Sequence, residues 1–285
     1  MQKVEKLALA HQNILDAKLK GLQLNISEYT FAVLYLFRNL HHYEVVFDEE
    51  IFIKGLMRDG TWFLMPTSHP QTWSEETFTF LRHMHCCLYP LPFEWLNSLE
   101  KKIKSFSFNE GDTDYLFNVD KIAHYPGRHL TKKRSLVTHL LEAHQVRSVK
   151  YEVDLAKDAL EVIQFWQSEK SNNKLDSDYE SAIEAVHLYD QLQLTGHLYY
   201  VDDLPQGLLI GEPLNTTCFA YHFGKASRNL NGLNQFMFQD FAQKLKGKCQ
   251  LINFEQDLGL PNLRLTKHSY HPDHLVQKYR VYLVD

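Results

Sequence analysis

Hydrophobic positions in the first 117 residues predict helices and then strands. Apolar residues recur at helical spacing up to about Leu19 and again after Ser27, where Phe31, Leu34 and Tyr35 share a face. Short apolar runs then predict strands over residues 44–47, 51–57 and 61–67, with an Asp-Gly hairpin signal at 59–60. We expect two further helices over 74–87 and 92–104 and a strand over 114–117.

The remaining residues repeat this alternation. A helix over 131–144 precedes a strand at 146–153, and helices follow over 155–169 and 177–192. Three strands come next over 196–202, 207–213 and 216–223, before a helix over 233–245 and strands over 249–254 and 278–284. This order resembles the GNAT acyltransferase arrangement. We therefore expect an α+β protein of two GNAT-like domains, residues 1–115 and 116–285, each a mixed, mostly antiparallel sheet flanked by helices.

Composition narrows the classes of function. The formal net charge of −5 disfavours indiscriminate nucleic-acid binding. The longest strongly apolar run, Phe31–Phe37, is far shorter than the roughly 20 residues of a membrane helix. The first residues lack a signal peptide's apolar core, so we expect a cytoplasmic protein. The cysteines form no spaced pair and are expected as reduced thiols, and we expect no metal site at His83–Cys87 or among His268, His271 and His274.

Two segments carry a resemblance to a known family. They are YLFNVDKIAHYPGRHLTKKRSL, residues 115–136, and INFEQDLGLPNLRLTKHSYHP, residues 252–272. Over most of its length the chain resembles the C-terminal catalytic domain family of phosphatidylglycerol lysyltransferases. The motif in the second segment falls on Asn253, Asp257, Gly259, Leu263, Arg264, Lys267, Ser269, Tyr270 and Pro272.

The resemblance implies a tandem GNAT fold and an enzyme that transfers an acyl or aminoacyl group. Family members with a membrane domain move an amino acid from aminoacyl-tRNA to a lipid. This chain departs from the family pattern where Ser135 and Leu136 follow Arg134, and where Gly224 precedes Lys225. Both differences bear on lysyl-lipid chemistry more than on the fold.

The donor of a GNAT domain binds where its fourth strand separates from its fifth. The coenzyme A signature there ends in two small residues, but Asn231 and Leu233 occupy those places after Arg228. Without glycines the backbone cannot approach a pyrophosphate closely, which favours aminoacyl-tRNA or another acyl carrier over acyl-coenzyme A. The alternative is an ordinary helix entry. No cofactor is required for either donor.

Basic residues concentrate at the start of the helix expected over 131–144. Five of them within seven positions could hold the phosphates of a tRNA acceptor end or of a lipid headgroup: Arg128, His129, Lys132, Lys133 and Arg134. The alternative is a solvated helix face.

The segment 252–272 is the expected source of catalytic groups. Asp257 or Glu255 would accept the proton of an attacking amine, and Tyr270 would protonate the leaving group. Arg264 and Lys267 would stabilise an anion. Donor or acceptor binding is expected from His222 and Lys225 on the facing strand end, from Arg228 in the loop that follows it, and from Asn253 and Ser269. The alternative is a buried salt-bridge network.

Three functions remain open from the sequence. The first is acyl or aminoacyl transfer to an amine or hydroxyl of a small molecule, lipid headgroup or peptide, with aminoacyl-tRNA as one possible donor. The second is a catalytically silent GNAT-fold binding module. The third is a peripheral aminoacyl-phospholipid synthase docked by the basic cluster. The intact motif in segment 252–272 favours an enzyme, and the oligomeric state does not follow from the sequence.

Overall fold

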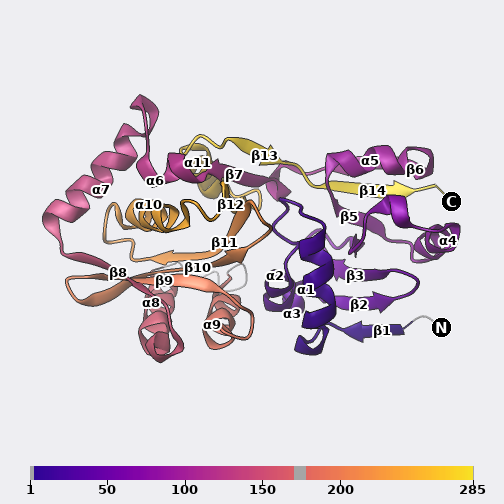
Figure 1. Ribbon diagram of the computed structural model, residues 1–285, viewed down its shortest axis with the longest axis horizontal. Coiled ribbons are helices and arrows are strands. Elements are labelled where there is room, and N and C mark those ends of the chain that lie inside the picture. Colours follow the sequence, from indigo (N-terminus) through magenta and orange to yellow (C-terminus); the bar gives the residue numbers. More distant parts are fainter. Residues whose placement is uncertain (1–2, 170–177, 285) are drawn as a thin grey trace. The chain divides into compact units, whose positions relative to one another are not determined.

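The computed structural model describes residues 3–169 and 178–284. Its chain divides into two compact units (Figure 1). Unit 1 comprises Met1–Tyr115, Glu255–Lys267 and His274–Asp285, and unit 2 comprises Leu116–Phe254 and His268–Asp273. The sequence predicts one C-terminal domain over residues 116–285, whereas two C-terminal segments belong to unit 1. Among the described residues, no helix combines the length and apolar character needed to span a bilayer.

Unit 1 is built on a mixed sheet in the order β1-β2-β3-β4-β5-β14-β6. Its strands are β1 (Lys3–Lys6), β2 (Glu44–Phe47), β3 (Ile51–Leu56), β4 (Trp62–Pro66), β5 (Cys87–Leu91), β6 (Ile103–Phe108) and β14 (Tyr279–Leu283). Its helices include α1 (Gln12–Gly21), α2 (Phe31–Leu36), α3 (Arg38–His41), α4 (Glu75–His83) and α5 (Phe93–Leu99), and α11 (Pro261–His268) begins in it.

Two predicted helices of unit 1 are shorter than expected, because a strand follows each. The helix expected over 74–87 ends at His83, and Cys87 begins strand β5, whose five residues are all buried. A continuous apolar run has no alternation, so its spacing does not separate a buried strand from a helix. The helix expected over 92–104 ends at Leu99, and Ile103 begins the exposed edge strand β6.

The last strand of the chain completes the sheet of unit 1. Strand β14 lies between β5 and β6 and is antiparallel to both, whereas the sequence places it in the C-terminal domain. Lys278, just before this strand, is fully buried and lies 2.7 Å from carboxylate oxygens of both Asp114 and Glu28. These buried ion pairs hold the segment that leads into β14 against Glu28 and Asp114, two residues of the N-terminal part of unit 1.

The sheet that lies in unit 2 includes strands in the order β7-β12-β11-β10-β9-β8. They are β7 (Asp114–Asn118), β8 (Val146–Lys150), β9 (Thr195–Val201), β10 (Leu204–Pro213), β11 (Cys218–Ala226) and β12 (Leu251–Gln256), and β13 (His274–Val276) follows later in the chain. Helix α10 (Leu233–Leu245) lies on one face of this sheet, and α8 (Ala156–Ser168) and α9 (Tyr179–His187) lie on the other (Figure 1). Two more helices, α6 (Val119–His124) and α7 (Thr131–Ala143), precede β8.

Most of these elements match the spacing of the sequence, but three helices differ from it. Helix α6 was not expected, and α11 forms where the sequence reads as an irregular stretch rich in Gly and Pro. The helix expected over 177–192 appears as α9, which ends at His187, while residue 177 lies outside the described residues.

Strands β11 and β12 run in parallel but pair over only a short stretch. The register pairs are Cys218 with Leu251, Phe219 with Ile252, and Ala220 with Asn253. Strand β11 continues to Ala226 without a further described pair to β12. The two strands therefore separate beyond Ala220, as expected for the fourth and fifth strands of a GNAT domain.

Candidate functional site

A β-bulge sets the direction of the polar side chains on β11. The register between β10 and β11 moves from Ile210–Phe223 to Gly211–Tyr221, so His222 is the extra residue on β11. An extra residue reverses the alternation of side chains along a strand. The Lys225 ammonium consequently lies 3.7 Å from the centre of the Trp166 ring, which belongs to α8.

The bulge lies in a buried polar cluster of unit 2. The His222 ring Nε2 lies 3.1 Å from a Glu212 carboxylate oxygen, and both side chains are buried. Lys225 is also buried and donates to both carboxylate oxygens of Asp178 at 2.6 Å. A buried charge is costly unless it is paired, and the Lys225 ammonium has the Asp178 carboxylate as its partner. His222 and Lys225 thus lie beyond the point where β11 leaves β12, together with two carboxylates that the sequence did not indicate.

The loop before α10 packs closely against α7. Arg228 has an exposed side chain, and its backbone N–H donates to the Glu169 carboxylate at 3.0 Å. Gly232 has φ +94°, and a Cβ there would lie 2.3 Å from the Leu136 carbonyl oxygen. Leu233, which takes the place of a small residue, is fully buried as the first residue of α10.

The basic cluster lies at the N-terminal end of α7. Arg128 and His129 belong to a short 3₁₀ turn that leads directly into this helix, and Lys132 follows in its first turn. These three side chains are exposed. Arg134 is half-buried and donates to the backbone carbonyls of Tyr125 and Gly127, so it also holds the turn before the helix.

Lys133 connects this cluster to the second motif segment. Its ammonium donates to the Ser269 hydroxyl at 2.7 Å and lies 3.9 Å from the centre of the Tyr270 ring. Tyr270 itself packs against Phe117, Tyr125, Phe238 and Phe254. Burial raises the pKa of the Tyr270 phenol, which makes it a weaker proton donor. Lys133 therefore meets two predicted residues that lie more than a hundred positions later in the sequence, Ser269 and Tyr270, in unit 2.

Asp257 and Arg264 form a second cluster, in unit 1. The Asp257 carboxylate is fully buried and accepts from Arg264 Nε at 2.7 Å and Nη2 at 3.2 Å. It also accepts from the Tyr115 hydroxyl at 2.6 Å and from the Gly259 N–H at 2.8 Å. Burial would raise the pKa of Asp257, but these hydrogen bonds outweigh it and lower the pKa below its ordinary value.

Glu255 and Lys267 lie beside this pair, but not as strand alternation predicts. Strand β12 ends at Gln256 and Glu255 has φ +60°, so alternation does not carry Glu255 and Asp257 onto one face. The Lys267 ammonium donates to the backbone carbonyls of Glu255 and Gln256. Burial lowers the pKa of Lys267 to about 8.

The predicted site residues thus divide between the two units. Glu255, Asp257, Arg264 and Lys267 lie in unit 1, and the others lie in unit 2: Arg128, Lys132, Lys133, Arg134, His222, Lys225, Arg228, Asn253, Ser269 and Tyr270. Asn253 is fully buried at the last register pair between β11 and β12. The expectation that Asp257 and Arg264 act together with His222 and Lys225 stays a prediction.

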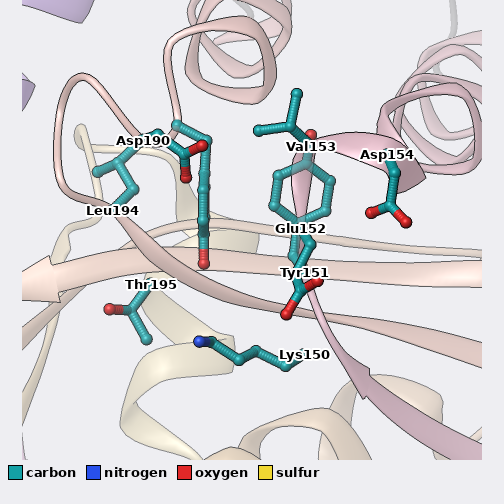
Figure 2. Close-up of a pocket in the computed structure, with 9 residues that line it drawn as sticks. Lys150, Tyr151, Glu152, Val153, Asp154, Asp190, Leu194 and Thr195 are labelled. Carbon is teal, nitrogen blue, oxygen red and sulfur yellow. The ribbon is translucent and has the colours of Figure 1, made fainter.

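A pocket of about 510 Å³ lies elsewhere in unit 2 (Figure 2). It is lined by Lys150, Tyr151, Glu152, Val153, Asp154, Tyr189, Asp190, Leu194 and Thr195. Figure 2 shows Asp154 and Asp190 on opposite sides of it. None of the residues singled out from the sequence lines this pocket, so it is separate from both clusters.

Comparison with known proteins agrees with this fold and these motifs. The separating strands, the bulge and the sheet order define a GNAT-like fold, and the sheets of both units are mixed. The family model "phosphatidylglycerol lysyltransferase, C-terminal" matches residues 19–282. The chain therefore belongs to that family, which is one of acyl- and aminoacyl-transferring enzymes.

Several individual proteins are similar to this chain. An uncharacterised protein of Mycoplasmoides gallisepticum is 23% identical over 202 residues, covering 68% of this chain and 63% of that protein, so the chain matches less than two thirds of this relative's length. A conserved protein of unknown function from Bacteroides thetaiotaomicron has a TM-score of 0.88 at 20% identity, with both chains fully covered.

Two further solved structures share the fold at lower identity. The C-terminal domain of a putative lysylphosphatidylglycerol synthetase from Agrobacterium fabrum has a TM-score of 0.66 at 12% identity, over 98% of this chain and 92% of that one. FemX has a TM-score of 0.57 at 10% identity, over 99% of this chain and 97% of that one. At these identities the likeness supports the fold alone.

Proposed function

We propose that this chain transfers an acyl or aminoacyl group from an activated ester to an amine or hydroxyl acceptor, with aminoacyl-tRNA as the donor. The observation that carries the proposal is the separation of β11 from β12 beyond Ala220 and Asn253, in a chain of this family. In a GNAT domain the activated acyl group enters that gap. His222 and Lys225 lie on the part of β11 beyond that separation, each with a carboxylate partner in unit 2.

The loop before α10 supports a donor other than coenzyme A. Leu233 is buried inside the first turn of α10, and the position before it tolerates no side chain because of the Leu136 carbonyl. A pyrophosphate is held there by backbone N–H groups when small residues allow a close approach. In this chain the start of α10, at Gly232 and Leu233, instead packs against α7.

The basic cluster supports an anionic substrate. Cations at a helix N-terminus are opposed by the helix dipole, by roughly 0.3–1 kcal/mol each at the surface. Arg128 and Lys132 are exposed at that end of α7, and their positive charges also repel one another. An anion bound there would relieve both effects, and the phosphates of a tRNA acceptor end or of a lipid headgroup have the required chemistry.

In unit 1 we assign Asp257 the role of holding Arg264 rather than of accepting a proton. Its two oxygens already accept hydrogen bonds from three residues, and its lowered pKa makes it a weak base. The Arg264 guanidinium, fixed in this way, is suited to stabilise an anionic group of the substrate or a developing oxyanion.

The proposal is tested with the purified chain and tRNA charged with radiolabelled amino acids. The protein should accelerate loss of label from the tRNA and transfer the label to a cell extract, resolved into lipid, peptide and small-molecule fractions. Arg264→Gln should lower the rate of transfer about 10²–10³-fold, the range for loss of a group that stabilises charge in the transition state. A parallel reaction with acetyl-coenzyme A tests the alternative donor.

Each outcome decides between the functions left open by the sequence. Label in the lipid fraction identifies an aminoacyl-phospholipid synthase, and label in another fraction identifies the acceptor class. Transfer from acetyl-coenzyme A with inert aminoacyl-tRNA would overturn the proposed donor. Absence of transfer from both donors, by protein that melts cooperatively, would identify a silent binding module.

A further inference from the structure

Strand β6 is an open edge of the sheet of unit 1. In the part of the chain that the structure describes, its one neighbour in this sheet is β14, so the backbone groups on its other side face no further strand. Its residues are all exposed except the half-buried Ile103. An exposed edge strand is a template for pairing with another chain, and proteins usually protect such edges with short strands or charged residues.

The two edges of this sheet are protected to different degrees. Strand β1, at the opposite edge, has four residues, and three of them are charged: Lys3, Glu5 and Lys6. Strand β6 has six residues with the sequence IKSFSF, and its one charged residue is Lys104. Strand β1 therefore has the features of a protected edge, whereas β6 has those of a strand that accepts a partner.

Aromatic rings extend this edge onto one face of the sheet. The buried Tyr279 of β14 is covered by three phenylalanine rings, whose centres lie 5.6–6.0 Å from its own. They are Phe93 at the start of α5 and Phe106 and Phe108 on β6, and each is 42–58% exposed. Because side chains alternate along a strand, Lys104 lies on the same face as Phe106 and Phe108. A group of exposed aromatic rings beside an open edge is typical of a protein–protein interface.

The charges around β6 change sign from one end of the strand to the other. Residues 100–104 carry three lysines and one glutamate, whereas residues 109–112 carry two carboxylates and no lysine or arginine. Lys104 is exposed, and the Glu110 side chain is 79% exposed although it lies 3.3 Å from Arg264. A second β6 strand in the parallel direction would bring like charges together. In the antiparallel direction it brings the lysines of each copy to the carboxylates of the other, so the strand is complementary to itself.

We propose that β6 is the interface between two copies of this chain, which pair antiparallel through this strand about a two-fold axis at Phe106. In this register Phe106 meets Phe106 of the second copy, and Lys104 faces Phe108 of the second copy. Glu110 of the second copy follows and lies diagonally from Lys104, within reach of a long side chain.

This pairing closes on itself. Each copy uses its open edge, and the outer strand that remains at the other edge of each sheet is the charged β1, so assembly stops at the dimer. The aromatic faces of the two sheets then form one continuous surface. The proposal does not depend on the donor or the acceptor of the proposed transfer reaction.

Sedimentation velocity over a series of protein concentrations tests the interface. The parent should form a reversible dimer of twice the chain mass. Phe106→Lys places two like charges opposite each other on the axis, so it should weaken the dimer at least about 10-fold. Val4→Lys is the matched control, because Val4 is 46% exposed on the opposite edge strand β1, and this variant should dimerise like the parent.

A charge exchange tests the antiparallel direction. Lys104→Glu and Glu110→Lys should each weaken the dimer because each places like charges together, and the double variant should restore it. Circular dichroism should show that these variants fold like the parent, since the substituted side chains are exposed. A parent that stays monomeric at every concentration, that forms species larger than dimers, or that dimerises no better than Phe106→Lys would overturn the proposal. A double variant as weak as the single ones would overturn the antiparallel register.

Discussion

Replacement of Asp257 by Asn should destabilise unit 1 by a measurable amount. The carboxylate is fully buried and accepts hydrogen bonds from Tyr115, Gly259 and Arg264. An amide keeps one acceptor oxygen but turns an NH₂ group toward donors. Hydrogen bonds to a charged group contribute about 1.5–3 kcal/mol each, and a donor left unpaired adds to the loss, so we expect Asp257→Asn to cost about 2–4 kcal/mol.

Calorimetric melting of the whole chain measures this loss. About 2–4 °C of Tm per kcal/mol, typical of chains of this size, gives a fall of about 5–15 °C. Asp203→Asn is the control, because that carboxylate is 90% exposed and lies 3.7 Å from its Arg147 partner. The control should melt within about 1 °C of the parent. Equal Tm values for Asp257→Asn and the parent would refute the holding role of this carboxylate.

The same pair of proteins gives a test by pH. The pKa of Asp257 is lowered in the folded chain from its ordinary value of 3.8, so its stabilisation is complete above that pH and disappears as the pH falls through the folded value. The difference in Tm between the parent and Asp257→Asn should therefore be constant from pH 5 to pH 7 and should shrink below pH 3.8. A difference that grows on acidification would contradict the sign of the shift.

Three other substitutions test features of the fold. Gly232→Ala should lower the Tm by more than Gly247→Ala, since both have positive φ but only Gly232 meets a backbone atom, the Leu136 carbonyl oxygen at 2.3 Å; equal losses would remove the steric argument. Lys225→Met should cost about 2–3 kcal/mol in a melting experiment, because it leaves a partly buried carboxylate without its cation. Lys267 has a pKa lowered to about 8 from 10.5, so the parent should gain stability relative to Lys267→Met as the pH rises between those values, and titration calorimetry or melting at pH 7.5 and 9.5 checks it.

The order of the strands in unit 2 could be predicted because they are bounded by turns. The runs that became β9, β10 and β11 are separated by short segments at 202–203 and 214–217, and α10 follows with helical spacing. Helix α11 could not be predicted in this way. Its residues are mostly exposed and it has no buried residue, so no apolar stripe marks it in the sequence.

Many residues of the candidate site could be predicted from the sequence, but the contacts between them could not. The motif drew attention to Asp257, Arg264 and Ser269, but not to the Tyr115 hydroxyl that Asp257 accepts from. Strands β7 and β12 are neighbours in one sheet, and this pairing brings the Tyr115 hydroxyl to Asp257. The bulge at His222 similarly depends on a register between strands that no local pattern specifies.

The position of β14 links the order of protein synthesis to the order of folding. Strands β5 and β6 are made well before β14, the strand that separates them in the sheet. A nascent chain emerging from the ribosome therefore presents both of these edges unpaired until residues 279–283 are released, whereas the strands β8 to β11 of unit 2 are all available sooner. Unpaired edges invite association with other chains. A chain that stops before residue 279 should thus leave one edge each of β5 and β6 in unit 1 unpaired, and nascent chains of this protein should need protection until β14 has been made.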